Sequence, residues 1–156
     1  MNQRELRDCF GLFATGVMIA TTSFEEALYG MTINSFASVS LDPALLLFSI
    51  DNKSSNLQVF QKAKNFTLSV LSEKQLLLAQ EFAKPANKKK WQIEQHFNRK
   101  SLSPIFQNSL GYFECETYKI IEAGDHHIFI GKIIDCAKLN DFKPLIYLGG
   151  KFSFLQ

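Results

Sequence analysis

The sequence GMTINSFASVSLDP spans residues 30–43 and mixes large apolar side chains with small polar ones. In an extended strand, successive side chains point to opposite faces. Alternation places on one face Thr32, Asn34, Phe36, Ser38 and Ser40, and on the other Ser35 and Val39. The first face carries the hydroxyl and amide groups that a planar heterocycle with carbonyls and ring nitrogens needs. An exposed polar sheet face would give the same pattern.

Strand patterns continue on both sides of this stretch. Residues 15–24 and 27–40 are rich in β-branched side chains and predict a hairpin that turns at Glu25-Glu26. Residues 44–50, after Asp42-Pro43, form an apolar run typical of a buried strand. Further strands are predicted over 65–71, 112–122, 127–139, 144–148 and 152–155. Six or so strands with few helices favour a barrel or sandwich over a doubly wound sheet.

Short helices are predicted between the strands. Leu6, Cys9, Phe10 and Phe13 have the spacing of one buried helical stripe. A second helix is predicted after the polar turn 51–56, and a third over 73–82 with Ser72 as its N-cap. Residues 84–110 predict a long excursion with a turn or two of helix. Within 65–71, Thr67 and Ser69 alternate with apolar residues, which predicts one dry and one wet face.

The composition predicts a single globular domain over residues 1–156. The chain is 46% hydrophobic and 21% charged, and its 15 Phe residues suit a core, a ligand site or a subunit contact. A net charge of +2 argues against nucleic-acid binding, and Lys88-Lys89-Lys90 is interpreted as a solvated loop. Without an apolar run of about 20 residues or a signal peptide, we expect no membrane partner and a cytoplasmic location.

Two polar segments are candidates for chemistry. Residues 51–55 (DNKSS) open a predicted helix, and helix amides, serine hydroxyls and a lysine would suit a phosphate, although plain capping explains the same residues. His126 and His127 are adjacent on a strand and point to opposite faces, which argues against a shared metal. The three cysteines form no CxxC pair and are interpreted as reduced. No metal site is expected.

Taken together, these motifs resemble the flavin reductase-like family. The resemblance rests on FATGV at 13–17, the string at 30–43, Ser54, GDH at 124–126 and PLIY at 144–147. It implies an FMN-binding split β-barrel, mainly β, with antiparallel Greek-key strands and a few short helices. It also implies a homodimer with flavin near the subunit interface, and NADH- or NADPH-dependent reduction of FMN, FAD or riboflavin.

The resemblance also assigns site residues. Thr32, Asn34 and Ser35 would meet the isoalloxazine edge, and Ser38, Val39 and Ser40 would line the ring and the ribityl chain. The phosphate would be held by Asn52, Lys53, Ser54 and Ser55. Phe82 and Ala83 would close the pocket, His126 would contact the nicotinamide nucleotide, and Tyr147 would support that side. The lysine-rich, glycine-free segment 84–100 departs from the family's glycine- and aspartate-rich loop.

The implied activity needs binding and orientation more than side-chain chemistry. Hydride transfer requires the nicotinamide carbon to stack about 3–3.5 Å from the flavin's central-ring nitrogen. Backbone amides and Thr32 or Asn34 would stabilise the negative charge that develops on reduction. We expect a flavin reductase, alone or as the reductase component of a two-component monooxygenase supplied by flavin diffusion. The alternative is a non-catalytic FMN-binding redox or sensor module, and a pyridoxamine phosphate oxidase fits less well.

Overall fold

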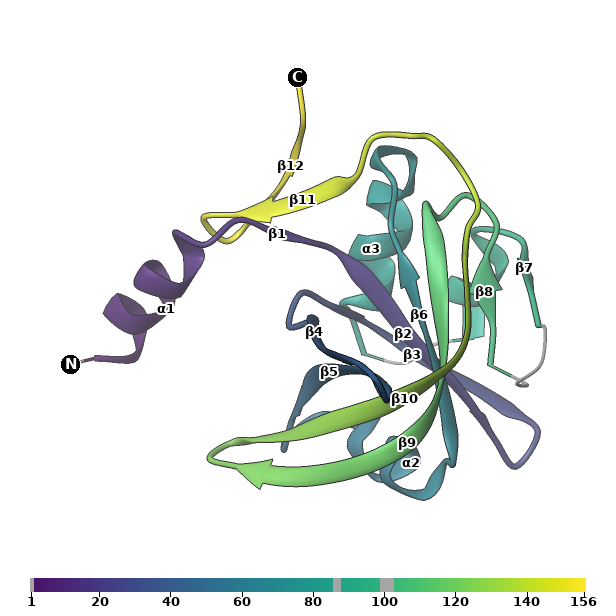
Figure 1. The fold of residues 1–156 in the computed structure, drawn as a ribbon. Coiled ribbons are helices and arrows are strands. Elements are labelled where there is room, and N and C mark those ends of the chain that lie inside the picture. The colour runs from purple at the N-terminus through teal and green to yellow at the C-terminus, as the bar shows by residue number, and fades with distance from the viewer. Residues whose placement is uncertain (1, 86–87, 99–102) are drawn as a thin grey trace.

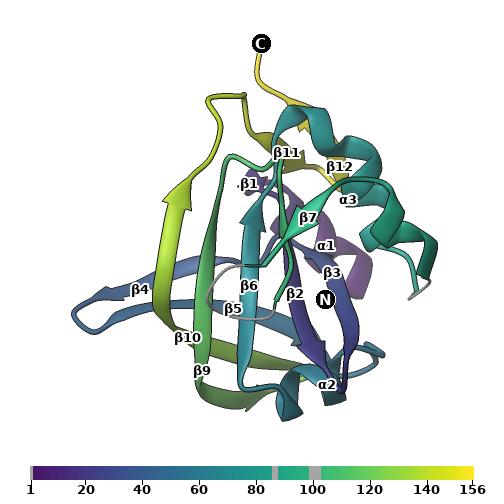
Figure 2. The same cartoon turned by 90° about the vertical axis from the view of Figure 1, so that its right-hand side faces the viewer.

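The fold is built on one antiparallel sheet. The computed structural model describes residues 2–85, 88–98 and 103–156. Seven strands pair in the order β3-β2-β6-β9-β10-β5-β4, and the sheet curls around a core (Figures 1 and 2). Their bounds are β2 Met18–Phe24, β3 Ala27–Ile33, β4 Ala37–Leu41, β5 Ala44–Asp51, β6 Asn65–Val70, β9 Gly111–Ala123 and β10 His126–Lys138. The predicted mainly β, antiparallel fold is confirmed.

Smaller elements surround this sheet. A three-stranded sheet contains β1 Thr15–Gly16, β11 Leu145–Leu148 and β12 Lys151–Phe154, and a two-stranded one β7 His96–Phe97 and β8 Ile105–Phe106. The α-helices are α1 Gln3–Gly11, α2 Leu57–Lys62 and α3 Leu76–Phe82, with 3-10 turns at Glu73–Gln75 and Lys88–Gln92. In the described ranges, every helix is too short or too polar to cross a membrane.

The hairpins follow from local turn chemistry. Glu25 and Glu26 join β2 to β3 with φ of 50° and 64°, the positive values that a tight two-residue hairpin turn needs. Gly124 and Asp125 join β9 to β10, as the sequence predicts. Before α3, Ser72 is the N-cap residue of the 3-10 turn: its N–H donates to Gln75 Oε1 at 2.9 Å, and Gln75 N–H donates to Ser72 O at 3.0 Å.

Aromatic side chains fill the interior of the curled sheet. The Phe48 ring on β5 lies 5.0 Å from Phe66 and 5.4 Å from Phe129, between ring centroids. Phe60 of α2 closes the cluster at 6.1 Å from Phe48. These four rings are at most 1% exposed. Part of the high Phe content therefore forms the core.

A second apolar layer covers the outer face of β2 and β6. It joins Ile19 of β2 to Phe82 of α3 and Phe106 of β8. The predicted wet face of the 65–71 strand is therefore wrong, because Thr67 and Ser69 are both 0% exposed. The segment around β8 packs over them, and Phe106 N–H donates to Ser69 Oγ at 3.5 Å. Sequence periodicity cannot reveal packing by a segment that is distant in the chain.

The polar stretch at 30–43 is two strands and not one. β3 ends at Ile33 and pairs with β2, whereas β4 begins at Ala37 and pairs with β5. The loop between them is held to β5 by Ser35, whose Oγ accepts a hydrogen bond from Ser49 N–H at 2.9 Å. The predicted alternation across residues 32–40 is therefore wrong beyond Ile33, because β3 and β4 lie at opposite edges of the sheet.

Helix α1 projects from the barrel beside β1, β11 and β12 (Figure 1). None of its residues is buried, and Phe10 and Phe13 are 69% and 78% exposed. The predicted buried stripe is therefore wrong for the single chain. The last residue of the helix is held by a hydrogen bond from Gly149 N–H to Gly11 O at 2.9 Å. Within the described residues, the rest of the helix packs against no other element closely enough to be buried, and its apolar face is exposed to solvent.

Candidate functional site

The main cavity, of about 610 Å³, lies along the open edge of β3. Four segments line it: the end of β3 with the following loop, the end of β5 with the turn after it, the end of α3, and the start of β10. Nine predicted site residues meet there: Thr32, Asn34, Ser35, Lys53, Ser54, Ser55, Phe82, Ala83 and His126. We call this the flavin-edge cavity. Its volume is in the range of about 300–1,000 Å³ that is usual for ligand sites.

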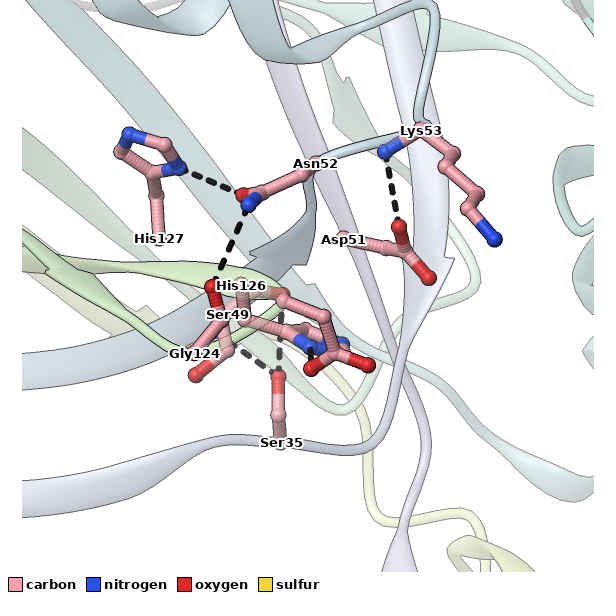
Figure 3. Close-up of polar contacts among 9 residues, drawn as sticks. Ser35, Ser49, Asp51, Asn52, Lys53, Gly124, His126 and His127 are labelled. Atoms are coloured by element: carbon pink, nitrogen blue, oxygen red, sulfur yellow. Dashed lines mark hydrogen bonds and ion pairs between the residues drawn. The ribbon is translucent and has the colours of Figure 1, made fainter. Parts of the chain in front are cut away.

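The turn at residues 51–56 supplies a cation and hydroxyls at one end. Two of its backbone amides are used within the turn. Lys53 N–H donates to Asp51 Oδ1 at 2.7 Å (Figure 3), and Ser54 N–H donates to Asp51 O at 2.9 Å. Helix α2 starts only at Leu57 and has six residues. The amides of Lys53 and Ser54 are therefore already bonded within the turn, and the side chains of Lys53, Ser54 and Ser55 line this end of the cavity. Their contact with a phosphate stays a prediction.

Asn52 takes a different role from the predicted one. Its Oδ1 lies 2.7 Å from His127 Nδ1, and its Nδ2 donates to Gly124 O at 3.4 Å (Figure 3). Asn52 does not line the flavin-edge cavity. It joins the turn to the β9–β10 hairpin, and so positions its neighbour Lys53.

His126 stands at the start of β10, facing the cavity that its neighbour His127 does not line. Its Nδ1 lies 2.7 Å from Asp125 Oδ1, so Nδ1 carries the proton and donates to the carboxylate. This hydrogen bond, together with the charge of His126, lowers the pKa of the exposed Asp125 carboxyl. A ligand would therefore meet the rest of the imidazole ring, Nε2 included.

Thr32 and Asn34 lie at the β3 edge, and they differ in whether their side chains are free to bond a ligand. Thr32 Oγ donates to Ala79 O at 2.7 Å and so ties β3 to α3, which commits the hydroxyl proton that the sequence analysis assigned to a ligand. Asn34 is exposed and lines the cavity. Of the two groups proposed to stabilise developing negative charge, the Asn34 amide is the one that remains a donor.

Tyr147 lines a smaller adjoining cavity of about 290 Å³. That cavity shares Thr32, Ile33, Asn34 and Ala83 with the first, and Phe152 lies in its wall. Tyr147 packs edge-on against Phe152, with 5.4 Å between ring centroids. It therefore lies beside the main cavity and not within it.

Ser38, Val39 and Ser40 are placed on β4, outside the flavin-edge cavity. Val39 is 46% exposed. None of the three lines this cavity, because the strand break at 34–36 places them on β4, at the other edge of the sheet. Their contact with the ring or the ribityl chain stays a prediction.

Sequence reasoning missed several lining residues. Apolar walls come from Met31, Ile33 and Ile50, and Lys84 and Pro85 follow the end of α3. The sequence pattern places Met31 and Ile33 within a strand. They line the cavity because β3 is at the edge of the sheet, which a local pattern does not show. Asn56, in the same polar turn as Lys53, was the omission that the sequence pattern signalled most directly.

The lysine run also departs from its interpretation as a solvated loop. Lys88 and Lys89 are exposed, but Lys90 is only 2% exposed. Its Nζ donates to Gly30 O at 3.1 Å and lies 4.6 Å from the Phe82 ring centroid. Burial lowers the pKa of Lys90, and the charge of Glu81 partly opposes this shift. Of the lysine-rich segment 84–100, residues 86–87 and 99–100 lie outside the described residues.

The donor set fits FMN. The cavity has apolar walls in the middle, an amide and hydroxyls beside them, and a lysine with two serines at one end. That arrangement matches a planar ring with a polar edge and an anionic tail. In the described part of the chain, no three His, Cys, Asp or Glu side chains gather as a metal site would require.

Comparison with known proteins identifies the class. The family model described as flavin reductase like domain matches residues 10–156, and the chain belongs to this family. The FMN reductase (NADH) SmoA of Agrobacterium fabrum is 38% identical over 97% of this chain and 86% of its own length. The solved flavin reductase PheA2 is 36% identical with a TM-score of 0.90, covering 100% of this chain and 99% of that one.

A further relative is larger than this chain. The reductase component of the flavin-dependent trigonelline monooxygenase of Acinetobacter baylyi is 43% identical over 135 residues. The match covers 83% of this chain and 42% of that protein. The chain thus spans less than half the length of this relative.

Proposed function

We propose that this chain binds FMN in the flavin-edge cavity and reduces it with a reduced nicotinamide nucleotide. The observation that carries the proposal is the cavity itself, with apolar walls between an anion-binding end at Lys53 and an imidazole at His126. When bound, the flavin accepts hydride from the nicotinamide. The membership of the family supports this activity.

The residues of the chain bind and orient. Lys53, Ser54 and Ser55 hold the phosphate, the half-buried Met31 packs on the ring, and Phe82 with Ala83 limits the entry of water. Asn34 donates a hydrogen bond at the end of the ring where negative charge develops. No side chain is required to transfer a proton in the hydride step.

A direct assay tests the activity. Purified protein is mixed with FMN and either NADH or NADPH, and the loss of nicotinamide absorbance is followed against a flavin-only control. We expect turnover with NADH, which the name of the Agrobacterium relative supports. Flavin that is retained while the nucleotide is not consumed would instead indicate the binding or sensor module.

Replacing His126 with alanine tests the orienting role. Loss of one polar contact costs about 1 kcal/mol, so we expect the KM for the nucleotide to rise about five-fold with little change in kcat. His127→Ala is the matched control, because His127 does not line the cavity. It bonds Asn52 beside Lys53, so the assay uses saturating FMN, and the variant should leave the KM for the nucleotide within about two-fold. Complete loss of turnover with normal nucleotide binding would contradict the orienting role of His126.

We further propose that two copies associate through α1. Phe10 of α1, and Leu12 and Phe13 directly after it, are exposed on a segment that projects from the barrel (Figure 1). Contiguous exposed apolar surface marks interaction sites. In a Phe10→Asp and Phe13→Asp double variant we expect the dimer Kd to rise about 100-fold or more, measured by sedimentation equilibrium. Leu77→Asp, at an exposed position on α3, is the control. An unchanged mass would overturn the proposed interface.

Reduced flavin would reach a partner oxygenase by diffusion, a proposal supported by the monooxygenase reductase component among the relatives. The cytoplasmic location stays a prediction from the sequence.

A further inference from the structure

We propose that a second cavity beside the flavin-edge cavity binds the adenylate half of FAD, so that this chain binds FAD more tightly than FMN. The inference rests on the proposed function, which puts the flavin phosphate at Lys53, Ser54 and Ser55, next to Asn56. The second cavity has a volume of about 470 Å³, within the range usual for ligand sites. We call it the adenylate cavity.

The two cavities lie in series along β3. Residues 31–33 line the flavin-edge cavity, and residues 27–30 line the adenylate cavity. At about 3.3 Å per residue, Ala27 lies about 13 Å along the strand from Met31. Asn56 lines both cavities, and its side chain makes no capping bond to α2. A ligand that leaves the first cavity at its phosphate end therefore passes Asn56 into the second.

The walls of the adenylate cavity suit adenosine phosphate. Tyr29 and Trp91 supply aromatic surface, against which a purine base stacks favourably. Lys88 supplies an exposed ammonium for a phosphate oxygen. Glu26, in the β2–β3 turn at the far end from Met31, offers a carboxylate to ribose hydroxyls or the adenine amino group. FMN ends at its phosphate and has no group that fills this space.

Lys90 builds this cavity and leaves Lys88 as the cation for the ligand. The Lys90 ammonium is held by Gly30 O and the Phe82 ring, which fixes the adjacent Trp91 against β3. A Cβ at Gly30 would lie 2.9 Å from Phe82 Cε1 and 3.2 Å from a Trp91 ring atom, so glycine permits this close packing. The buried lysine thus fixes the position of the aromatic wall.

The lysine run contains its own matched control. Lys88 lines the adenylate cavity, whereas the adjacent Lys89 is equally exposed and does not line it. In the wild type we expect the Kd for FAD to be about ten-fold below that for FMN. Lys88→Ala should raise the Kd for FAD about ten-fold, the loss of one charge-assisted contact, and leave that for FMN unchanged. Lys89→Ala should change neither.

Trp91 is the only tryptophan in the sequence and reports on the cavity directly. Titration with AMP, in the absence of flavin, should change the Trp91 emission in a saturable way, and the titration should shift to higher AMP in Lys88→Ala but not in Lys89→Ala. AMP should also weaken the binding of FAD without displacing FMN.

The outcomes separate this inference from the proposed function. If FMN binds but Lys88→Ala and Lys89→Ala affect FAD equally, or not at all, the adenylate cavity is wrong and the flavin site stands. If Lys88→Ala raises the KM for NADH with FMN as the flavin and leaves the FAD affinity unchanged, the cavity serves the nucleotide and the inference is overturned. If the wild type binds neither FMN nor FAD, the proposed function fails and takes this inference with it.

Discussion

Replacing Phe48 with alanine is expected to lower the free energy of unfolding by about 3–5 kcal/mol, the usual cost of deleting a buried phenyl ring. Phe48 is 0% exposed and contacts the rings of Phe60, Phe66 and Phe129, so its loss leaves a cavity at the centre of the barrel. Chemical denaturation followed by circular dichroism measures the change.

Controls keep this prediction falsifiable. Tyr118→Ala removes an aromatic ring that is 57% exposed on β9, and should cost less than about 1 kcal/mol. If Phe48→Ala fails to fold, Phe48→Leu should still fold, and its free energy of unfolding should fall by less than the value expected for the alanine variant. A Phe48→Ala protein as stable as Tyr118→Ala would show that the ring cluster is not the centre of the core.

The second large effect is expected at the anion-binding end of the flavin-edge cavity. A Lys53→Ala and Ser55→Ala double variant removes two exposed side chains that line this end, and it keeps Ser54, whose Oγ accepts a bond from Asn56 N–H at 3.2 Å. Loss of charge-assisted phosphate contacts worth about 1.5–3 kcal/mol should raise the Kd for FMN by about 10- to 100-fold.

Riboflavin separates a phosphate contact from a general disturbance of the site. Riboflavin lacks the phosphate, so the double variant should bind it within about two-fold of the wild type. Lys62→Ala, at an exposed position near the end of α2 and outside the cavity lining, should leave both affinities unchanged. Equal weakening of riboflavin and FMN would mean that Lys53 and Ser55 do not hold the phosphate.

The Phe48 variant and the Lys53 and Ser55 double variant both test how the core supports the binding loops. The phenylalanine cluster stabilises β5, and β5 carries Ser49, which holds the Ser35 loop, and ends in the turn that presents Lys53. The binding groups are thus on loops, but each loop leaves a strand that is buried and well packed. Precise placement of a planar ligand needs such rigid support, because the hydride step tolerates little misalignment.

Local patterns were sufficient wherever neighbouring residues decide the conformation. The Glu25-Glu26 hairpin, the Ser72 cap and the β9–β10 hairpin lie where the sequence predicts them, because turn and cap preferences act over a few residues. The motifs that carried the family resemblance also led to nine of the lining residues of the flavin-edge cavity, and the contacts of these residues with a flavin remain predictions.

By itself, the amino-acid order specified most of the strands, the antiparallel class and the family, since periodicity, turns and motifs are properties of adjacent residues. Only the tertiary structure separated Ser38 from Thr32, covered Thr67, buried Lys90 and left α1 in solvent. Each of these depends on which distant segment packs against the residue, and such contacts arise from long-range packing that leaves no local pattern in the chain.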